Sequence, residues 1–310
     1  MVFGIISALF LLAYTLFLGV FLYAFVMLKI LLPDALVRRL IDPPIVLIAT
    51  LWIQGILFWL NRVYRIQWDI DGMQRHSLEQ WFLITANHQS WVDIFVLYQA
   101  YLKKAPLLKF FIKKELGYVP VVGQAWWALD FPFMRRYSKA FLRKHPEKAG
   151  DDLIETQQAC RKFSYQPTSV MNFLEGTRFT PEKHASQNSP YRHLLKPKTG
   201  GLAFAIQALG DRFSALTNVT IVYPDGIPTF WDMMCGRLQR VIVRIQEEPI
   251  PAHFTQGDYQ NDRHLRAEMQ HWTSTLWQAK DRQIEDILGR QSHTSAPSNS
   301  NKANVVVGQQ

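Results

Sequence analysis

The sequence predicts an α/β fold, a mixed sheet flanked by helices, which is preceded by an N-terminal two-helix membrane segment. Two observations carry this prediction. Residues 1–28 contain no charged side chain, and beyond Arg62 strand-like and helix-like stretches alternate along the chain. We therefore expect membrane-anchoring helices over residues 1–61, a folded domain over 62–288, and a disordered tail over 289–310, which is rich in Ser, Asn, Gln and Gly.

The first apolar segment, residues 5–27, consists almost entirely of Leu, Phe, Ala, Val and Tyr. It is long enough to cross the roughly 30 Å hydrocarbon core of a bilayer, so it predicts a membrane helix. A cleaved signal peptide is the alternative. Such a peptide has a basic start, a shorter apolar core and a small-residue cleavage site, whereas the first cation here is Lys29.

A second apolar segment, residues 44–60, follows a loop that carries Lys29, Arg38 and Arg39. It is at the lower limit of spanning length, so it either spans the bilayer or lies in the interface. Charge does not fix the orientation, because basic residues flank the two segments on both sides. A helical hairpin that enters one leaflet and returns would satisfy both flanks.

Beyond Arg62 the strand-like runs are residues 64–70, 81–86, 131–133, 168–173, 215–223 and 240–245. The helix-like runs are residues 91–103, 137–144, 151–163, 200–209 and 263–288. No internal repeat is visible in the sequence. The alternation of the two kinds of run favours an α/β core.

The most informative motif is NHQSWVD at residues 87–93, which places His88 and Asp93 with four residues between them. A neutral imidazole can take a proton from a hydroxyl when a carboxylate on its far nitrogen fixes the tautomer and stabilises the cation. Residues five apart on an ideal helix lie roughly 140° apart, so the pair meets only if His88 lies in the turn before the helix. Taken alone, the spacing also fits coincidence, with Asp93 merely favouring a helix N-terminus.

Three further blocks follow this motif: FPFMRR at residues 131–136, FLEGTRF at 173–179 and VTIVYP at 219–224. With NHQSWVD they stand in the order of the four blocks of the glycerophospholipid acyltransferases, the PlsC-like 1-acylglycerol-3-phosphate acyltransferase family. The chain resembles this family over about residues 60–250. The wording NHQSWVD, PFMRR, EGTRFT and PKTGG is most similar to the bacterial YihG-like acyltransferases and their eukaryotic relatives.

Two blocks depart from the family pattern. Leu174 replaces the proline of the commoner F-P-E-G wording, although Glu175 and Gly176 remain. The family's V-P-V block is replaced by a strand that ends at Tyr223 and Pro224, which leaves the role of that proline open.

The resemblance implies a membrane-bound enzyme that moves a fatty acyl group from acyl-CoA or acyl carrier protein to the free hydroxyl of a lysophospholipid. The first acceptor implied is 1-acylglycerol-3-phosphate, so the product is phosphatidate; remodelling of other lysophospholipids is the alternative. The thioester is a co-substrate, and neither a further cofactor nor a metal is implied. The resemblance also places the catalytic domain on the cytoplasmic side of a bacterial inner membrane, in contact with membrane lipids.

For the site, His88 is expected to act as the general base and Asp93 to orient it. The resemblance assigns the acceptor phosphate to the second and third blocks, whose candidate residues are Arg135, Arg136, Glu175, Gly176, Thr177 and Arg178. Guanidinium groups suit this role because they match phosphate oxygens bidentately and stay charged.

Simpler interpretations exist for several of these residues. Adjacent Arg135 and Arg136 are often one solvated charge and one surface ion pair. Gly176 can serve only to make a turn with positive φ. Glu175 ends an apolar run and needs a partner there, which we expect to be an arginine or a substrate hydroxyl.

A basic segment over residues 103–114 reads KKAPLLKFFIKK. Lysines interleaved with bulky apolar residues suit the surface of an anionic bilayer, and they equally suit a strand or helix with a solvated edge. Trp126 and Trp127 fit either interfacial anchors or the core. Lys196 and Lys198 could help to hold the phosphates of an acyl donor, or could simply flank a turn into a helix.

The net charge of +9 also allows a basic membrane-anchored scaffold or lipid-binding protein without catalysis. No zinc-finger, RNA-recognition or basic-zipper signature accompanies that charge, so no nucleic-acid partner is predicted. A hydrolase or metal enzyme built on His88 and Asp93 is a third class. The remaining candidate ligands lack ligand-like or C-x-x-C spacing: His145, His184, His193, Cys160 and Cys235.

Overall fold

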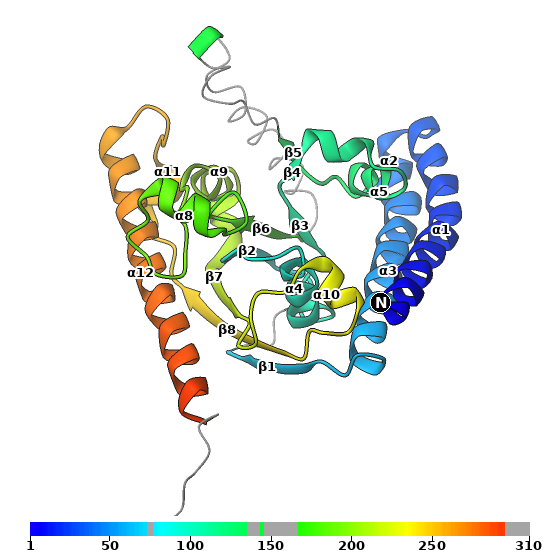
Figure 1. The fold of residues 1–310 in the computed structure, drawn as a ribbon. Coiled ribbons are helices and arrows are strands. Elements are labelled where there is room, and N and C mark those ends of the chain that lie inside the picture. The colour runs from blue at the N-terminus through cyan, green and yellow to red at the C-terminus, as the bar shows by residue number, and fades with distance from the viewer. Residues whose placement is uncertain (73–76, 135–142, 146–166, 295–310) are drawn as a thin grey trace, which may run out of the picture.

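The computed structural model describes residues 1–72, 77–134, 143–145 and 167–294, and a mixed sheet forms its centre (Figure 1). Its strands are β1 (Gln67–Asp71), β2 (Trp81–Ala86), β3 (Leu108–Phe110), β6 (Ser169–Phe173), β7 (Phe213–Val222) and β8 (Arg240–Glu248). They stand in the order β1-β8-β7-β2-β6-β3. Neighbouring strands run parallel except β7 and β8, which pair antiparallel. The predicted mixed α/β sheet is therefore confirmed.

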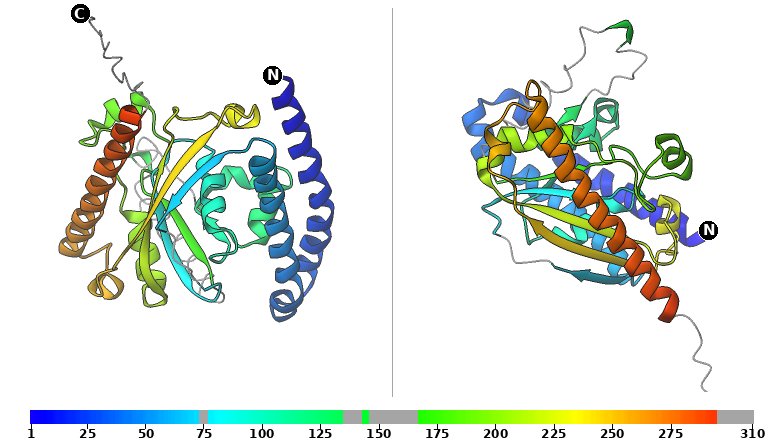
Figure 2. Two further views of the ribbon diagram at one scale, coloured as in Figure 1. Left: turned by 90° about the horizontal axis from the view of Figure 1, so that it is seen from below. Right: turned by 90° about the vertical axis from the view of Figure 1, so that its left-hand side faces the viewer.

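Helices cover both faces of this sheet (Figure 2). One face packs against α4 (Asp93–Tyr101), and the other packs against α9 (Gly200–Leu209), α11 (His253–Gln256) and α12 (Arg263–Thr294). Side chains of β2 alternate between the two cores, with Phe82 and Ile84 on the α4 side and Leu83 on the other. Burial on both faces explains why the central strands read as nearly continuous apolar runs.

The N-terminal hairpin packs outside α4 (Figure 2). It consists of α1 (Val2–Leu31) and α3 (Asp42–Arg62), joined by α2 (Asp34–Leu36) and a short π-helix (Val37–Ile41). The stretches Val2–Leu31 and Asp34–Arg62 are long and apolar enough to cross a membrane, by length and composition alone. The two predicted apolar helices are thus confirmed, and the second is longer than the predicted residues 44–60.

Short elements are the main additions to the sequence prediction. They are β3, β4 (Ile112–Lys113), η2 (Lys114–Tyr118), α5 (Val122–Ala128), α8 (Pro181–Gln187), η5 (Gly210–Arg212), α10 (Phe230–Met234) and α11, while β5 (Phe133–Met134) pairs with β4. Elements of one or two turns carry too few residues for a periodic signal. At α10, Thr229 and Asp232 form a capping box, which the sequence prediction did not include.

The C-terminal helix extends beyond the predicted end of the folded domain at residue 288. Helix α12 continues to Thr294, so residues 289–294 do not belong to the predicted disordered tail, whose remainder lies outside the described residues. The predicted helices 137–144 and 151–163 also fall outside the described residues, apart from 143–144.

Candidate active site

The site forms where neighbouring parallel strands end at the same edge of the sheet. Ala86, the last residue of β2, is paired with Phe173 at the end of β6 and with Val219 in β7. The residues that follow, His88 after β2 and Glu175 after β6, therefore emerge side by side. Open α/β sheets bind ligands outside the carboxyl ends of their strands, and this edge is such a place.

His88 and Asp93 are in direct contact. Nδ1 of His88 lies 2.9 Å from Oδ2 of Asp93, with Asp93 as the first residue of α4 and His88 in the turn before it. This is the geometry that the spacing required. Because the carboxylate can only accept, the proton of the neutral imidazole lies on Nδ1 and the lone pair is left on Nε2.

Three further donors fix the buried Asp93 carboxylate. Its Oδ2 also accepts the backbone N–H groups of Gln89 at 2.6 Å and Ser90 at 2.9 Å, while Oδ1 accepts the hydroxyl of Tyr223 at 2.6 Å. Burial and the neighbouring carboxylate raise the pKa of Tyr223 well above its usual value, so the phenol stays a donor. Asp93 is held against rotation away from His88.

The imidazole of His88 is stacked on Phe173, with ring centroids 3.9 Å apart and planes 13° apart. Its backbone is held as well, because its N–H donates to Oε1 of Glu175 at 3.0 Å and its carbonyl accepts from the N–H of Phe179 at 2.7 Å. The side chain is 14% exposed, so the ring is fixed on one side and reachable on another. That combination suits a general base.

Glu175 holds the backbone of the turn that carries His88. Its side chain is fully buried, and Oε2 accepts the N–H of Leu195 at 3.1 Å while Oε1 accepts that of His88. Among the described residues, two backbone amides reach this carboxylate; the expected arginine or substrate hydroxyl stays a prediction, because Arg135 and Arg136 lie outside the described residues. Burial raises the pKa of Glu175, and the two amides and the ammonium of Lys280 oppose that rise.

The rest of the E-G-T-R turn faces outward. Gly176 has φ +67°, and a Cβ there would lie 3.2 Å from the side chain of Lys198, so the turn requires glycine. Thr177 accepts from the ammonium of Lys183 at 2.8 Å. Arg178 is exposed, and its guanidinium lies 4.9 Å from the ring centre of Trp91. Trp91 belongs to residues 87–92, the turn between β2 and α4 that carries His88 and is called the histidine turn below.

The structure thus brings His88, Asp93 and residues 175–178 together, whereas Arg135 and Arg136 lie outside the described residues. Sequence reasoning missed Tyr223 and Phe173 as parts of the site. A sequence signal was present for Tyr223, because the fourth block ends in Tyr223 and Pro224 in place of the family's V-P-V wording.

The basic segment 103–114 contributes β3, β4 and the loop before them, with Leu108 and Ile112 buried and Lys103 exposed. Lys109 is only 7% exposed, and burial lowers its pKa to about 8. The interpretation as strands with a charged edge is therefore the better one.

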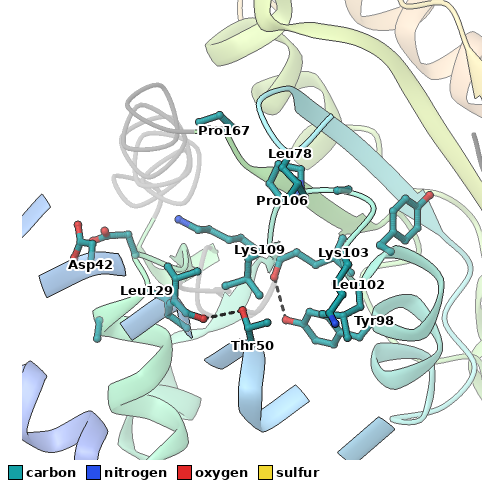
Figure 3. Close-up of a pocket in the computed structure, with 17 residues that line it drawn as sticks. Asp42, Thr50, Leu78, Tyr98, Leu102, Lys103, Pro106, Lys109, Leu129 and Pro167 are labelled. Atoms are coloured by element: carbon teal, nitrogen blue, oxygen red, sulfur yellow. Dashed lines mark hydrogen bonds between the residues drawn. The ribbon is translucent and has the colours of Figure 1, made fainter. Parts of the chain in front are cut away.

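Lys109 lines a cavity of about 390 Å³ (Figure 3). Asp42 of α3 and Tyr98 of α4 line it too, together with Pro106 and Pro167, which precede β3 and β6. Because Pro106 and Pro167 stand at the starts of β3 and β6, the cavity lies at the opposite end of the sheet from His88, which follows the end of β2.

The chain is similar to known acyltransferases in sequence and in fold. The Acyltransferase family model matches residues 67–225. The human 1-acyl-sn-glycerol-3-phosphate acyltransferases gamma and delta are 26% and 27% identical to the chain over 184 and 195 residues. Each match covers 56% of this chain but only 44% and 43% of those proteins, so the chain matches less than half of their length.

Among solved structures, the crystal structure of the 1-acyl-sn-glycerophosphate acyltransferase PlsC from Thermotoga maritima is similar in fold. The TM-score is 0.51 at 19% sequence identity, and the match covers 92% of this chain and 97% of that one. The family model matches just over half of the chain and spans the His88, Glu175 and Tyr223 blocks. On this evidence the chain belongs to the acyltransferase family.

Proposed function

We propose that the protein transfers a fatty acyl group from acyl-CoA or acyl carrier protein to the free hydroxyl of a lysophospholipid, with 1-acylglycerol-3-phosphate as the first candidate. The contact between His88 and Asp93 at 2.9 Å, at the carboxyl end of β2, carries this proposal. The names of the relatives support the choice of acceptor. Membership of the YihG-like subgroup is proposed from the wording of the sequence motifs alone.

In the proposed reaction, Nε2 of His88 removes the proton of the acceptor hydroxyl as its oxygen attacks the thioester carbonyl. The tetrahedral intermediate collapses to the ester, the carbon–sulfur bond breaks, and the departing thiolate takes the proton from the imidazolium. Asp93 stabilises the imidazolium between these steps. No acyl-enzyme forms in this scheme, so a serine or cysteine nucleophile is not needed.

The acceptor phosphate needs cations near His88. Arg178 is exposed and lies over Trp91, which belongs to the same turn as His88. The ammonium of Lys198 borders Gly176. A planar guanidinium can bind two phosphate oxygens at once, which makes Arg178 the first candidate, with Arg135 and Arg136 beside it in the proposal.

A bilayer supplies such acceptors, and the hairpin supports membrane association. Helix α1 is packed against the domain along its length: Gly4 lies against Trp231 and Cys235, Gly19 against Val121, and Lys29 donates to the carbonyl of Ala128 at 2.7 Å. A helix that crossed the whole bilayer would not have a folded domain along its side. These contacts favour a hairpin that enters one leaflet.

The outer surface of α1 is apolar. Its exposed side chains include Ile5, Leu9, Leu16, Phe17, Val20 and Met27. So large an apolar surface needs a cover, and lipid tails fit it. The surface continues onto α10, where Phe230 and Trp231 are exposed, and the preceding Pro228 accepts a hydrogen bond from Ser90 of the histidine turn. An acceptor could thus reach His88 from the membrane.

The test is product formation with defined donors and acceptors. Purified protein in detergent is incubated with labelled acyl-CoA or acyl carrier protein and with lysophosphatidate, lysophosphatidylglycerol, lysophosphatidylcholine or monoacylglycerol. Diacyl product with a phosphate-bearing acceptor supports the proposal, and the acceptor profile separates phosphatidate synthesis from remodelling. Lipid binding without product for every pair would favour the non-catalytic lipid-binding protein.

A further inference from the structure

Helix α12 carries a charged side chain in its buried stripe. The helix lies across the sheet face opposite the hairpin (Figure 2). Its inward residues are mostly apolar, Trp277 and Ile284 among them, yet Lys280 is only 1% exposed. A buried ammonium is costly unless it is paired, so this position needs an explanation.

Lys280 connects the helix to the site electrostatically. Its ammonium donates to the carbonyl of Val219 in β7 and lies 5.0 Å from the ring centre of Trp277. Burial lowers the pKa of Lys280, and the negative charge of Glu175 opposes that fall. Val219 is itself paired with Ala86 at the end of β2, so the lysine sits beneath the strand ends that carry the site.

A second connection runs through hydrogen bonds. The indole N–H of Trp277 donates to the carbonyl of Leu195 at 3.1 Å, and the N–H of Leu195 donates to Oε2 of Glu175 at 3.1 Å. Oε1 of Glu175 then accepts the N–H of His88 at 3.0 Å. Trp277, Leu195 and Glu175 are all fully buried, so water does not compete for these bonds.

We propose that Lys280 and Trp277 are positioning residues for His88 and act through Glu175, an inference that rests on the proposed function. Lys280 keeps Glu175 a carboxylate, and Trp277 holds Leu195 in place at its second oxygen. Both oxygens can then accept backbone N–H groups. A protonated Glu175 would have an O–H to donate where two N–H donors face it, and the support of the His88 backbone would weaken.

The charges around Glu175 agree with this role. Burial raises the pKa of Glu175, the carboxylate of Asp93 on α4 adds to the rise, and Lys280 on α12 opposes it. Burial likewise lowers the pKa of Lys280, and Glu175 opposes that fall. Lys198 lies against Gly176 next to them. Removing Lys280 therefore shifts Glu175 toward its protonated form.

The decisive experiment compares Lys280→Met with Thr273→Val by amide hydrogen exchange in the full-length protein in detergent. Lys280→Met keeps the long apolar stem and removes the charge. Thr273 is a fully buried polar residue of the same helix whose hydroxyl donates to the carbonyl of Met269 in that helix at 2.7 Å, so Thr273→Val is a matched control. We expect roughly fivefold faster exchange at the amide of His88 in Lys280→Met alone.

Activity gives a second readout. The acidic limb of the kcat profile should move up by about one pH unit in Lys280→Met and stay in place in Thr273→Val. Trp277→Phe, which keeps an aromatic ring and loses the donor, should speed exchange at Leu195 and His88 even if Lys280→Met does not fold.

Unchanged exchange at His88 in variants that fold would overturn the inference and leave Lys280 as a core residue that caps Val219. Hydrogen exchange requires no substrate, so this outcome is distinct from failure of the proposed function. That failure would appear as a wild-type protein without acyl transfer.

Discussion

Tyr223 donates its hydroxyl to Oδ1 of Asp93 at 2.6 Å across 130 positions of the chain. The bond joins the end of β7 to the first residue of α4, and both partners are buried. The carboxylate that orients His88 is therefore held by its own turn on one oxygen and by a distant strand on the other.

Tyr223→Phe removes one of the four donors to the Asp93 carboxylate and keeps the ring. We expect kcat to fall about tenfold, since a hydrogen bond to a charged group contributes about 1.5 kcal/mol or more, while KM stays nearly unchanged. Tyr98→Phe is the matched control, because that buried phenol donates to the carbonyl of Leu108, away from His88. Equal losses of kcat in the two variants would contradict a specific role for Tyr223.

Arg178→Ala should weaken acceptor binding. The exposed guanidinium lies next to the histidine turn, so its removal should raise the apparent KM for a phosphate-bearing acceptor with little change in kcat. The same outcome is expected for Arg136→Ala. Arg192→Ala serves as a control, since Arg192 is exposed and pairs with Glu285 on α12. The assignment fails if KM for lysophosphatidate is the same in Arg178→Ala as in Arg192→Ala.

Lys109 should make stability depend on pH in the alkaline range. Burial lowers its pKa in the folded state to about 8, against an ordinary value of 10.5. Between these values the unfolded chain binds more protons, so the free energy of unfolding gains a contribution that rises with pH. Relative to Lys109→Met, the wild type should become more stable from about pH 8 to 10.5 in denaturant titrations. Parallel curves would show that Lys109 does not titrate there.

The proposed insertion of the hairpin into one leaflet predicts from which side of the membrane a thiol label can react. In a background with Cys160 and Cys235 replaced by serine, Leu36→Cys places a thiol at the hairpin turn, where Leu36 is 44% exposed. Added to sealed inverted membrane vesicles and to intact cells, a membrane-impermeant maleimide should not label this thiol from the side opposite the catalytic domain. Labelling from that side would show that both helices span.

Local patterns predicted the elements that carry the site. β2 and α9 have the predicted boundaries, and the turn between β2 and α4 brings His88 to Asp93 as the spacing required. These features depend on neighbours in the sequence. The His88 and Glu175 blocks meet because β2 and β6 are adjacent in the sheet, and that pairing is tertiary.

The partners of the buried polar groups could not be predicted in this way. Glu175 accepts from the amides of His88 and Leu195, which only the fold places beside it. Lys280 interrupts the inward stripe that includes Met269, Leu276, Trp277 and Ile284. A lysine in such a stripe is a readable sign of a buried partner, although the sequence does not say which one.

The role of His88 is measured by acyl transfer of the wild type and of His88→Ala under identical conditions, with labelled acyl-CoA or acyl carrier protein and lysophosphatidate. Near-UV circular dichroism and membrane attachment of the two proteins are checked first. If Nε2 of His88 is the general base, labelled diacyl product forms with the wild type and none above background forms with His88→Ala. Product from a well-folded His88→Ala protein at the wild-type rate would contradict this role of His88.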